Sequence, residues 1–150
     1  MPRLDAEVIE KIELPLNSDN EIADVVSRFE NCSLPYCNWT HRAHLCVAAS
    51  YVRHLSFHDA MEKLRHHINQ YKHACGDEHG YNETITILFL KQMCHDMDAG
   101  HCCNSLAEEL LRLESEYGIS WLYRYYSKEL IWSDQAKTGW IEPDLNPLEF

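Results

Sequence analysis

Apolar residues recur at helical spacing in successive stretches of this 150-residue chain, and its five glycines and five prolines fall between those stretches. An apolar residue at every third or fourth position gives a helix one face that can be buried. The pattern therefore predicts an all-α fold. The chain is long enough to bury a core of its own, which indicates a single domain over residues 1–150.

Polar residues that cap helix N-termini stand before each stretch. The predicted caps are, in chain order, Ser18, Thr40, Ser56, Asn82 and either Asn104 or Ser105. Glu21 and Asp59 follow two of these caps by three residues, as in a capping box. Gly76 is expected to end the third helix, and the fifth is expected to stop before Gly118.

The remaining segments are shorter or irregular. Residues 119–131 predict a short sixth element, and residues 133–136 predict one further turn. Residues 1–17 are expected to form an extended arm, and residues 137–150 a second arm packed on the helices. Short connections favour antiparallel neighbours, so we expect a compact up-down bundle of five to six helices.

Charge and composition narrow the classes of partner. The formal net charge is −11, which argues against binding to nucleic acid or to an anionic membrane surface. No apolar run approaches the length of a membrane-spanning helix, and the N-terminus lacks the apolar region of a secretory signal. Seven cysteines, an odd number with no CxxC pair, favour free thiols. We therefore expect a cytoplasmic protein.

The second predicted helix carries histidines on its apolar face. Its stripe includes Leu45, Ala48 and Val52, and helical spacing places His41 and His44 inside that stripe. Arg42 is expected on the solvent side of the same helix.

The fourth predicted helix carries a carboxylate in a similar position. Glu83 lies near the centre of a stripe that continues through Ile87 and Leu90, whereas Lys91 and Gln92 are expected to face solvent. A buried carboxylate is costly unless it is paired, although a helix N-terminus lowers that cost.

These two unusual helix ends are predicted to meet. If the second, third and fourth helices alternate in direction, the N-termini that carry His41, His44 and Glu83 lie at one end of the bundle. The loop 76–81, which contains His79 and Tyr81, would close over that end, and Trp39 would form an aromatic wall. We expect a pocket there.

Three interpretations of this pocket remain open. His41, His44 and Glu83, with His79 as a possible fourth ligand, could hold one divalent metal ion, zinc or iron. Glu83 and a histidine could instead work as a metal-free acid–base pair. In the third interpretation the buried His/Glu network is purely structural.

Four stretches of the sequence are similar to a family of small, mostly bacterial, uncharacterised proteins. The stretches are NWTHRAHL at 38–45, GYNETIT at 80–86, YYSKELIWS at 125–133 and GWIEPDLNPL at 139–148. No activity is attached to that family, so the resemblance implies no reaction. Its pattern has a histidine where this chain has Asn82. The matching site positions are His41, Arg42, His44, Tyr81, Glu83, Thr84 and Thr86.

Two functional classes follow. The first is a small enzyme that acts on a small polar metabolite, with Glu83, His44, Tyr81 and Arg42 as the predicted catalytic residues. In that class Arg42 or Arg124 would hold a substrate carboxylate or phosphate. The second is a non-catalytic binding or adaptor protein, whose acidic surface and C-terminal arm would serve a protein partner or a homodimer.

Overall fold

The computed structural model describes residues 10–77, 80–101 and 103–150, and within these ranges the chain forms helices and no strands. The predicted all-α fold is confirmed. The longer helices are α1 (Asp19–Glu30), α2 (His41–Val52), α3 (Phe57–Cys75), α4 (Glu83–Asp98) and α5 (Leu106–Glu116). The shorter ones are the 3-10 helix η1 (Tyr36–Asn38), α6 (Ile119–Leu122), α7 (Lys128–Ile131) and α8 (Asp134–Thr138).

The long helices begin at the predicted caps. At each one a cap side-chain oxygen accepts a hydrogen bond of 3.0–3.2 Å from the backbone N–H three residues later. Ser105, not Asn104, caps α5. Gly76 ends α3 with φ of 74°, a left-handed conformation that glycine adopts without steric cost. The predicted sixth element is divided into α6 and α7, because residues 123–127 are not helical.

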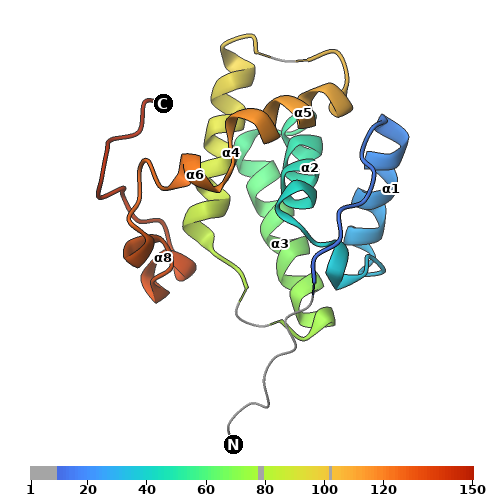
Figure 1. Ribbon diagram of the computed structural model, residues 1–150, viewed down its shortest axis with the longest axis horizontal. Helices are drawn as coiled ribbons and strands as arrows, with labels where there is room; N and C mark the ends of the chain where they lie inside the picture. Colours follow the sequence, from blue (N-terminus) through green and yellow to red (C-terminus); the bar gives the residue numbers. More distant parts are fainter. Residues whose placement is uncertain (1–9, 78–79, 102) are drawn as a thin grey trace, which may run out of the picture.

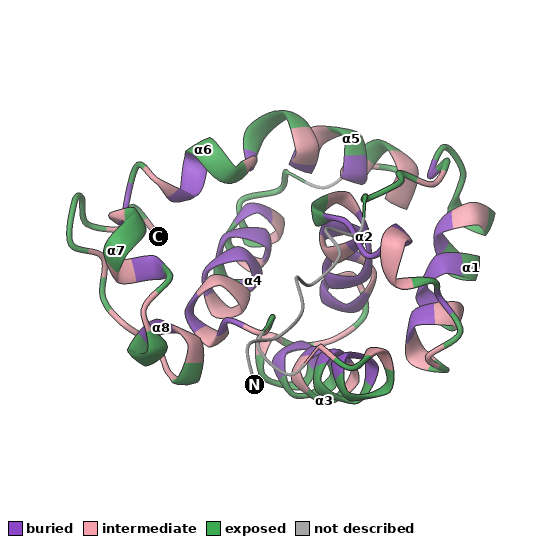
Figure 2. Cartoon of the chain, turned by 60° about the horizontal axis from the view of Figure 1, so that its bottom comes forward, coloured by how far each residue is buried: buried purple, intermediate pink, exposed green. Residues whose placement is uncertain are grey.

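Helix α2 lies at the centre of the fold and contacts α1, α3, α4 and α5. Figure 1 shows that α5 runs across the direction of α2 and α4 instead of continuing an alternation of parallel rods. The arrangement is therefore helical throughout, but it is more irregular than the simple up-down bundle expected from the sequence. Figure 2 shows buried positions along α2 and α4, whereas α3 keeps an exposed outer face.

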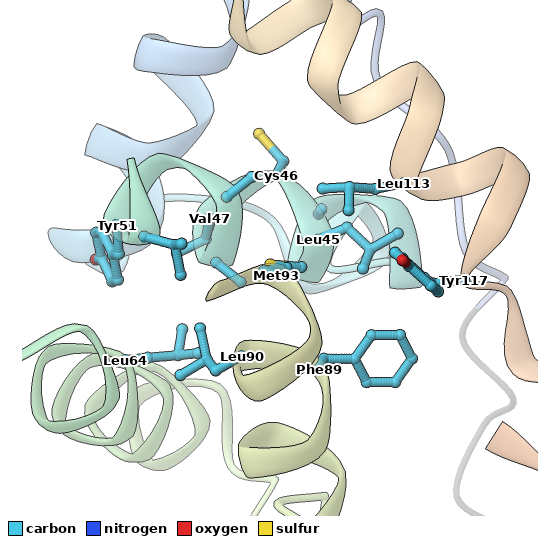
Figure 3. Close-up of a cluster of buried hydrophobic side chains, with 14 of the residues drawn as sticks. Leu45, Cys46, Val47, Tyr51, Leu64, Phe89, Leu90, Met93, Leu113 and Tyr117 are labelled. Atoms are coloured by element: carbon cyan, nitrogen blue, oxygen red, sulfur yellow. The ribbon is translucent and has the colours of Figure 1, made fainter. Parts of the chain in front are cut away.

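Side chains from four helices form the core. In Figure 3, Leu45 and Val47 of α2 lie near Leu64 of α3, Leu90 of α4 and Leu113 of α5. These five side chains are at most 4% exposed. Burial of large aliphatic side chains contributes about 1.5–3 kcal/mol each, so this junction is a major source of stability. The six cysteines in the described ranges form no disulfide.

Backbone hydrogen bonds attach both ends of the described chain to the helices. The N–H of Ile12 donates to the carbonyl of Cys37 (2.8 Å), and the Asn38 side chain donates back to the carbonyl of Ile12 (3.0 Å). At the other end, the N–H of Leu145 donates to the carbonyl of Tyr125 (3.0 Å). In the described part of the chain, no helix is both long and apolar enough to span a bilayer.

Candidate functional site

A cavity of about 380 Å³ lies between α2, α3 and α4. The first turns of α2 and α4 line it together with the last turns of α3, so the predicted meeting of these helix ends occurs. Its polar and aromatic lining comprises Lys11, Tyr36, Trp39, His41, His44, Lys72, Asp77, Tyr81, Asn82, Thr86, Phe89 and Trp132. This volume is within the range of about 300–1,000 Å³ typical of small-molecule sites.

His44 is held in one tautomer by its own helix. Its Nδ1 lies 2.6 Å from the carbonyl oxygen of Thr40, and a carbonyl can only accept, so Nδ1 carries the proton. Its ring packs on Trp39 with centroids 3.8 Å apart. Burial lowers the pKa of His44 to about 4, although the bond to Thr40 opposes that shift. At neutral pH the ring is therefore uncharged, and Nε2 is its acceptor nitrogen.

His41 differs from the sequence prediction because it is exposed, not buried in the apolar stripe. It belongs to the first turn of α2, where neighbouring elements leave one side of the ring open. Its Nε2 lies 3.2 Å from the carbonyl oxygen of Tyr117, which assigns the proton to Nε2 and leaves Nδ1 as the acceptor. The ring packs edge-on against Phe89. His41 thus lies on the rim of the cavity.

Glu83 does not line the cavity. Its carboxylate accepts hydrogen bonds from the Arg65 guanidinium (3.1 Å and 3.2 Å from Nε) and from the Tyr81 hydroxyl. Burial alone would raise the pKa of Glu83, but these bonds together outweigh burial and lower it. The sequence prediction correctly identified a carboxylate that needs a partner. The partner is an arginine of α3, eighteen residues earlier, and not a histidine of α2.

Arg42 also points away from the cavity. Its Nε lies 3.1 Å from the Glu114 carboxylate, and Nη1 donates to the carbonyl of Leu14 (3.3 Å). The side chain therefore joins α2 to α5 and to the N-terminal arm. Of the four predicted catalytic residues, His44 and Tyr81 line the cavity, whereas Glu83 and Arg42 do not.

The other predicted site positions on α4 are occupied by structural hydrogen bonds. Asn82 caps the helix and also donates to the carbonyl of Ile131 (2.7 Å). The Thr84 hydroxyl donates to the carbonyl of Gly139 (2.7 Å), and Thr86 donates to the carbonyl of Asn82 (2.8 Å). Asn82 and Thr86 still contribute to the cavity wall, but Thr84 does not.

Three polar lining residues were missed by sequence reasoning, namely Lys11, Tyr36 and Lys72, whereas Asp77 belongs to the loop that was expected to close over the pocket. The Tyr36 hydroxyl donates to Asp77 (2.5 Å), and burial together with that bond raises the pKa of Tyr36 to about 12. Lys11 lies over the Tyr36 ring at 3.5 Å. Lys72 is buried, and helical spacing after Ile68 could have revealed it. The arm residue Lys11 carries no such periodic signal.

The described donor groups do not converge on the predicted metal site. Only one set of three His, Cys, Asp or Glu side chains within the described ranges has ligand atoms within 4.8 Å of one another, namely His58, Asp59 and Glu62. That set is fully exposed at the start of α3. His41, His44 and Glu83 form no such group, because Glu83 is bound to Arg65. His79 lies outside the described residues.

A second polar network lies toward the C-terminal end of α4. Gln92, expected to face solvent, is buried and donates to Asp96 (2.9 Å). Asp96 also accepts from Arg112 (3.0 Å) and from the Tyr117 hydroxyl (2.6 Å). Arg112 of α5 and Tyr117 at its C-terminal end therefore supply the partners of Asp96. Through its carbonyl, Tyr117 connects this network to His41.

Comparison of the chain with protein-family models finds no match, and comparisons with curated proteins and with solved structures find none either. The resemblance to the small bacterial family therefore remains a prediction. Functional inference rests on the residues of the cavity.

Proposed function

We propose that this protein is a small enzyme that binds an organic molecule in the cavity between α2, α3 and α4 and transfers a proton to or from it through His44. The observation that supports this proposal is the fixed tautomer of His44 on the cavity wall. With Nδ1 bound to Thr40, the unprotonated Nε2 is the ring's basic atom. No hydrogen bond from a described residue to Nε2 is found.

The lowered pKa of His44 determines the protonation state of its ring at neutral pH and its strength as a base. At neutral pH almost every molecule has His44 in its basic form, although a base with a pKa of about 4 is weak. A negative charge on the substrate would raise that pKa toward neutrality and strengthen the base. His41, exposed at the rim, is suited to exchange the proton with solvent.

The structure favours this proposal over the metal site predicted from the sequence. A zinc or iron centre would need a third donor beside His41 and His44, and the carboxylate expected to supply it is bound to Arg65 and Tyr81. The acid–base proposal needs no third donor. It also differs from the acid–base pair predicted from the sequence, because His44 acts here without Glu83.

Deuterium exchange in heavy water tests the proposal. The protein is incubated with a defined mixture of small organic acids, esters and alcohols, and NMR follows incorporation of deuterium and formation of products. We expect the wild type to convert at least one component and His44→Asn to lose that conversion. Asparagine can keep the bond to the Thr40 carbonyl but lacks a nitrogen at the Nε2 position, so it separates the base from the structural bond.

Glu83→Gln serves as the matched control, because Glu83 lies outside the cavity. That variant should retain conversion, and a chelator should leave the wild-type rate unchanged. Equal conversion by the wild type and His44→Asn would contradict the role of His44. Loss of conversion in both Glu83→Gln and chelated wild type would instead favour the metal centre. Saturable binding without conversion would favour the non-catalytic class.

A further inference from the structure

The residues that line the cavity change from polar to apolar along α2 and along α3, and the change runs in the same spatial direction on both helices. On α2, His41 and His44 come first and Ala48 follows one turn later. On α3 the order along the chain is reversed, from Leu64 to Lys72. Because α2 begins where α3 ends, both helices place their polar lining residues at the same end of the cavity.

Helix α4 follows the same gradient. Asn82 and Thr86 of its first turn line the polar end, and Phe89 and Met93 line the wall one and two turns further on. Phe89 and Met93 are at most 7% exposed. The cavity therefore has a polar end, near the N-termini of α2 and α4, and an apolar end enclosed between the three helices.

The opening lies at the polar end. Ile119 and Trp132 line the cavity and are 50% and 45% exposed, although both side chains are large and apolar. Trp132 follows Ile131, whose carbonyl is bound by Asn82 at the start of α4. His41 and Lys11, also at this end, are exposed as well. A ligand that enters here meets polar groups at the rim and apolar side chains inside.

The polar end carries a cation that solvent can reach. Lys11 is exposed, and its ammonium nitrogen lies 3.5 Å from the centroid of the Tyr36 ring. Lys72 and Asp77 also line this end, and each of them already has an interaction partner within the protein. In a chain with a net charge of −11, an exposed lysine at the mouth of an apolar cavity favours an anionic group.

We infer that the cavity binds a single-chain amphiphile with an anionic head, such as a medium-chain carboxylate, which enters chain first. The alkyl chain of the ligand would lie toward Leu64 and Met93, and its anionic head group would remain near Lys11 and His44. This inference rests on the cavity of the proposed function and names the substrate class that it fits. It places the head group, and not the chain, next to the proposed base.

A chain-length series tests the apolar end with the wild-type protein. Butanoate, hexanoate, octanoate and decanoate are titrated while tryptophan fluorescence is recorded, since Trp39 and Trp132 line the cavity. Each methylene group buried should tighten binding about fourfold. Affinity that does not increase with chain length would overturn the inference.

Two neighbouring alanines provide a matched pair of variants. Ala48 lines this cavity, whereas Ala49 lines a neighbouring cavity of about 170 Å³ between α2, α4 and α5, and the two cavities share Met93 as their common lining residue. Ala48→Leu should weaken decanoate binding about fifteenfold, because it occupies space for roughly two methylene groups and each contributes about fourfold. Ala49→Leu should not change it. Equal affinities of the two variants for decanoate would mean that its alkyl chain binds elsewhere, and would contradict the inference. If Ala48→Leu does not fold, the chain-length series with the wild-type protein decides the question.

Decanol tests the head group, because it has the same chain without the charge. We expect decanol to bind more weakly than decanoate, and Lys11→Gln to weaken decanoate binding without affecting decanol. Equal binding of decanol and decanoate, unaltered by Lys11→Gln, would overturn the anionic head. These binding results are independent of conversion. Saturable decanoate binding with no His44-dependent reaction would contradict the proposed function alone.

Discussion

His44 and Glu83 differ in where their partners lie. The hydrogen bond of His44 is within its own helix, to Thr40 one turn earlier, and that bond determines which nitrogen is basic. Glu83 depends on Arg65 of another helix. The protonation state of His44 is set by burial, whereas that of Glu83 is set by a specific cation that offsets burial. The two groups therefore respond to pH in different ranges.

The pKa of His44 predicts a loss of stability on mild acidification. The folded-state pKa, about 4, lies below the unfolded value of about 6.5, so the unfolded chain binds the extra proton between these two values. The free energy of unfolding should therefore fall as the pH falls through this window. Between pH 7 and pH 4.5 the contribution of His44 should be about 2 kcal/mol.

Urea denaturation of the wild type and of His44→Asn at both pH values measures this contribution. His67, whose pKa is also lowered by burial, acts in the same direction in both proteins and cancels in the comparison. The wild type should lose about 2 kcal/mol more than the variant on acidification. Parallel losses would show that the folded protein does not keep His44 neutral.

At the scale of elements, the cap of α4 also joins this helix to α7. Asn82 uses its side-chain oxygen to cap α4 and its nitrogen to bind the carbonyl of Ile131 at the end of α7. Asparagine is therefore the residue that holds α4 and α7 together at the rim of the cavity. Thr40, the cap of α2, also makes a second bond, because its hydroxyl donates to Glu13 of the N-terminal arm (2.9 Å).

Asn82→Asp separates these two bonds. Aspartate keeps the capping oxygen but cannot donate to the Ile131 carbonyl and places a second acceptor against it. We expect the free energy of unfolding to fall by about 2 kcal/mol at neutral pH. Ser56→Asp is the control, because Ser56 is an exposed cap without a second bond; its effect should be within about 0.5 kcal/mol. Similar effects of the two substitutions would contradict the bond to Ile131.

At the scale of the whole molecule, the residues after α8 lie against the helices, and their backbone carbonyls accept hydrogen bonds from buried hydroxyl groups. The fully buried Thr84 donates to the carbonyl of Gly139, and the Tyr126 hydroxyl donates to the carbonyl of Ile141 (2.5 Å). Leu148 and Phe150 pack against the core. The segment 139–150 is thus part of the folded domain.

Truncation after Thr138 should destabilise the protein. At least five hydrogen bonds to the segment are lost, including those of Asp144 with the N–H of Ser127 (2.8 Å) and of Asn146 with the carbonyl of Arg124 (2.6 Å). At about 1 kcal/mol each, their loss should lower the free energy of unfolding by about 5 kcal/mol and the melting temperature by roughly 10–20 °C. A shorter truncation after Asn146 keeps those bonds and removes Leu148 and Phe150 only, so its effect should be smaller. Thermal melting followed by circular dichroism compares the two; an unchanged melting temperature after the longer truncation would show that the segment contributes no stability.

The sequence by itself determined the local structure of this protein. Helical periodicity and capping chemistry depend on residues within about one turn of each other, and five helix starts and the glycine that ends α3 were predicted from them. Alternation of helix direction also placed His44 and Tyr81 at one cavity. Each of these inferences needs only neighbours along the chain or the direction of adjacent helices.

Tertiary structure decided the partners of the charged side chains. Glu83 could pair with any cation brought near α4, and only the packing of α3 against α4 selects Arg65 over the histidines of α2. Arg112 of α5 likewise binds Asp96, the partner of Gln92, and the N-terminal arm brings Lys11 to the rim of the cavity. Long-range pairing depends on the rotation and offset of packed helices, and a helical period in one segment does not specify these quantities.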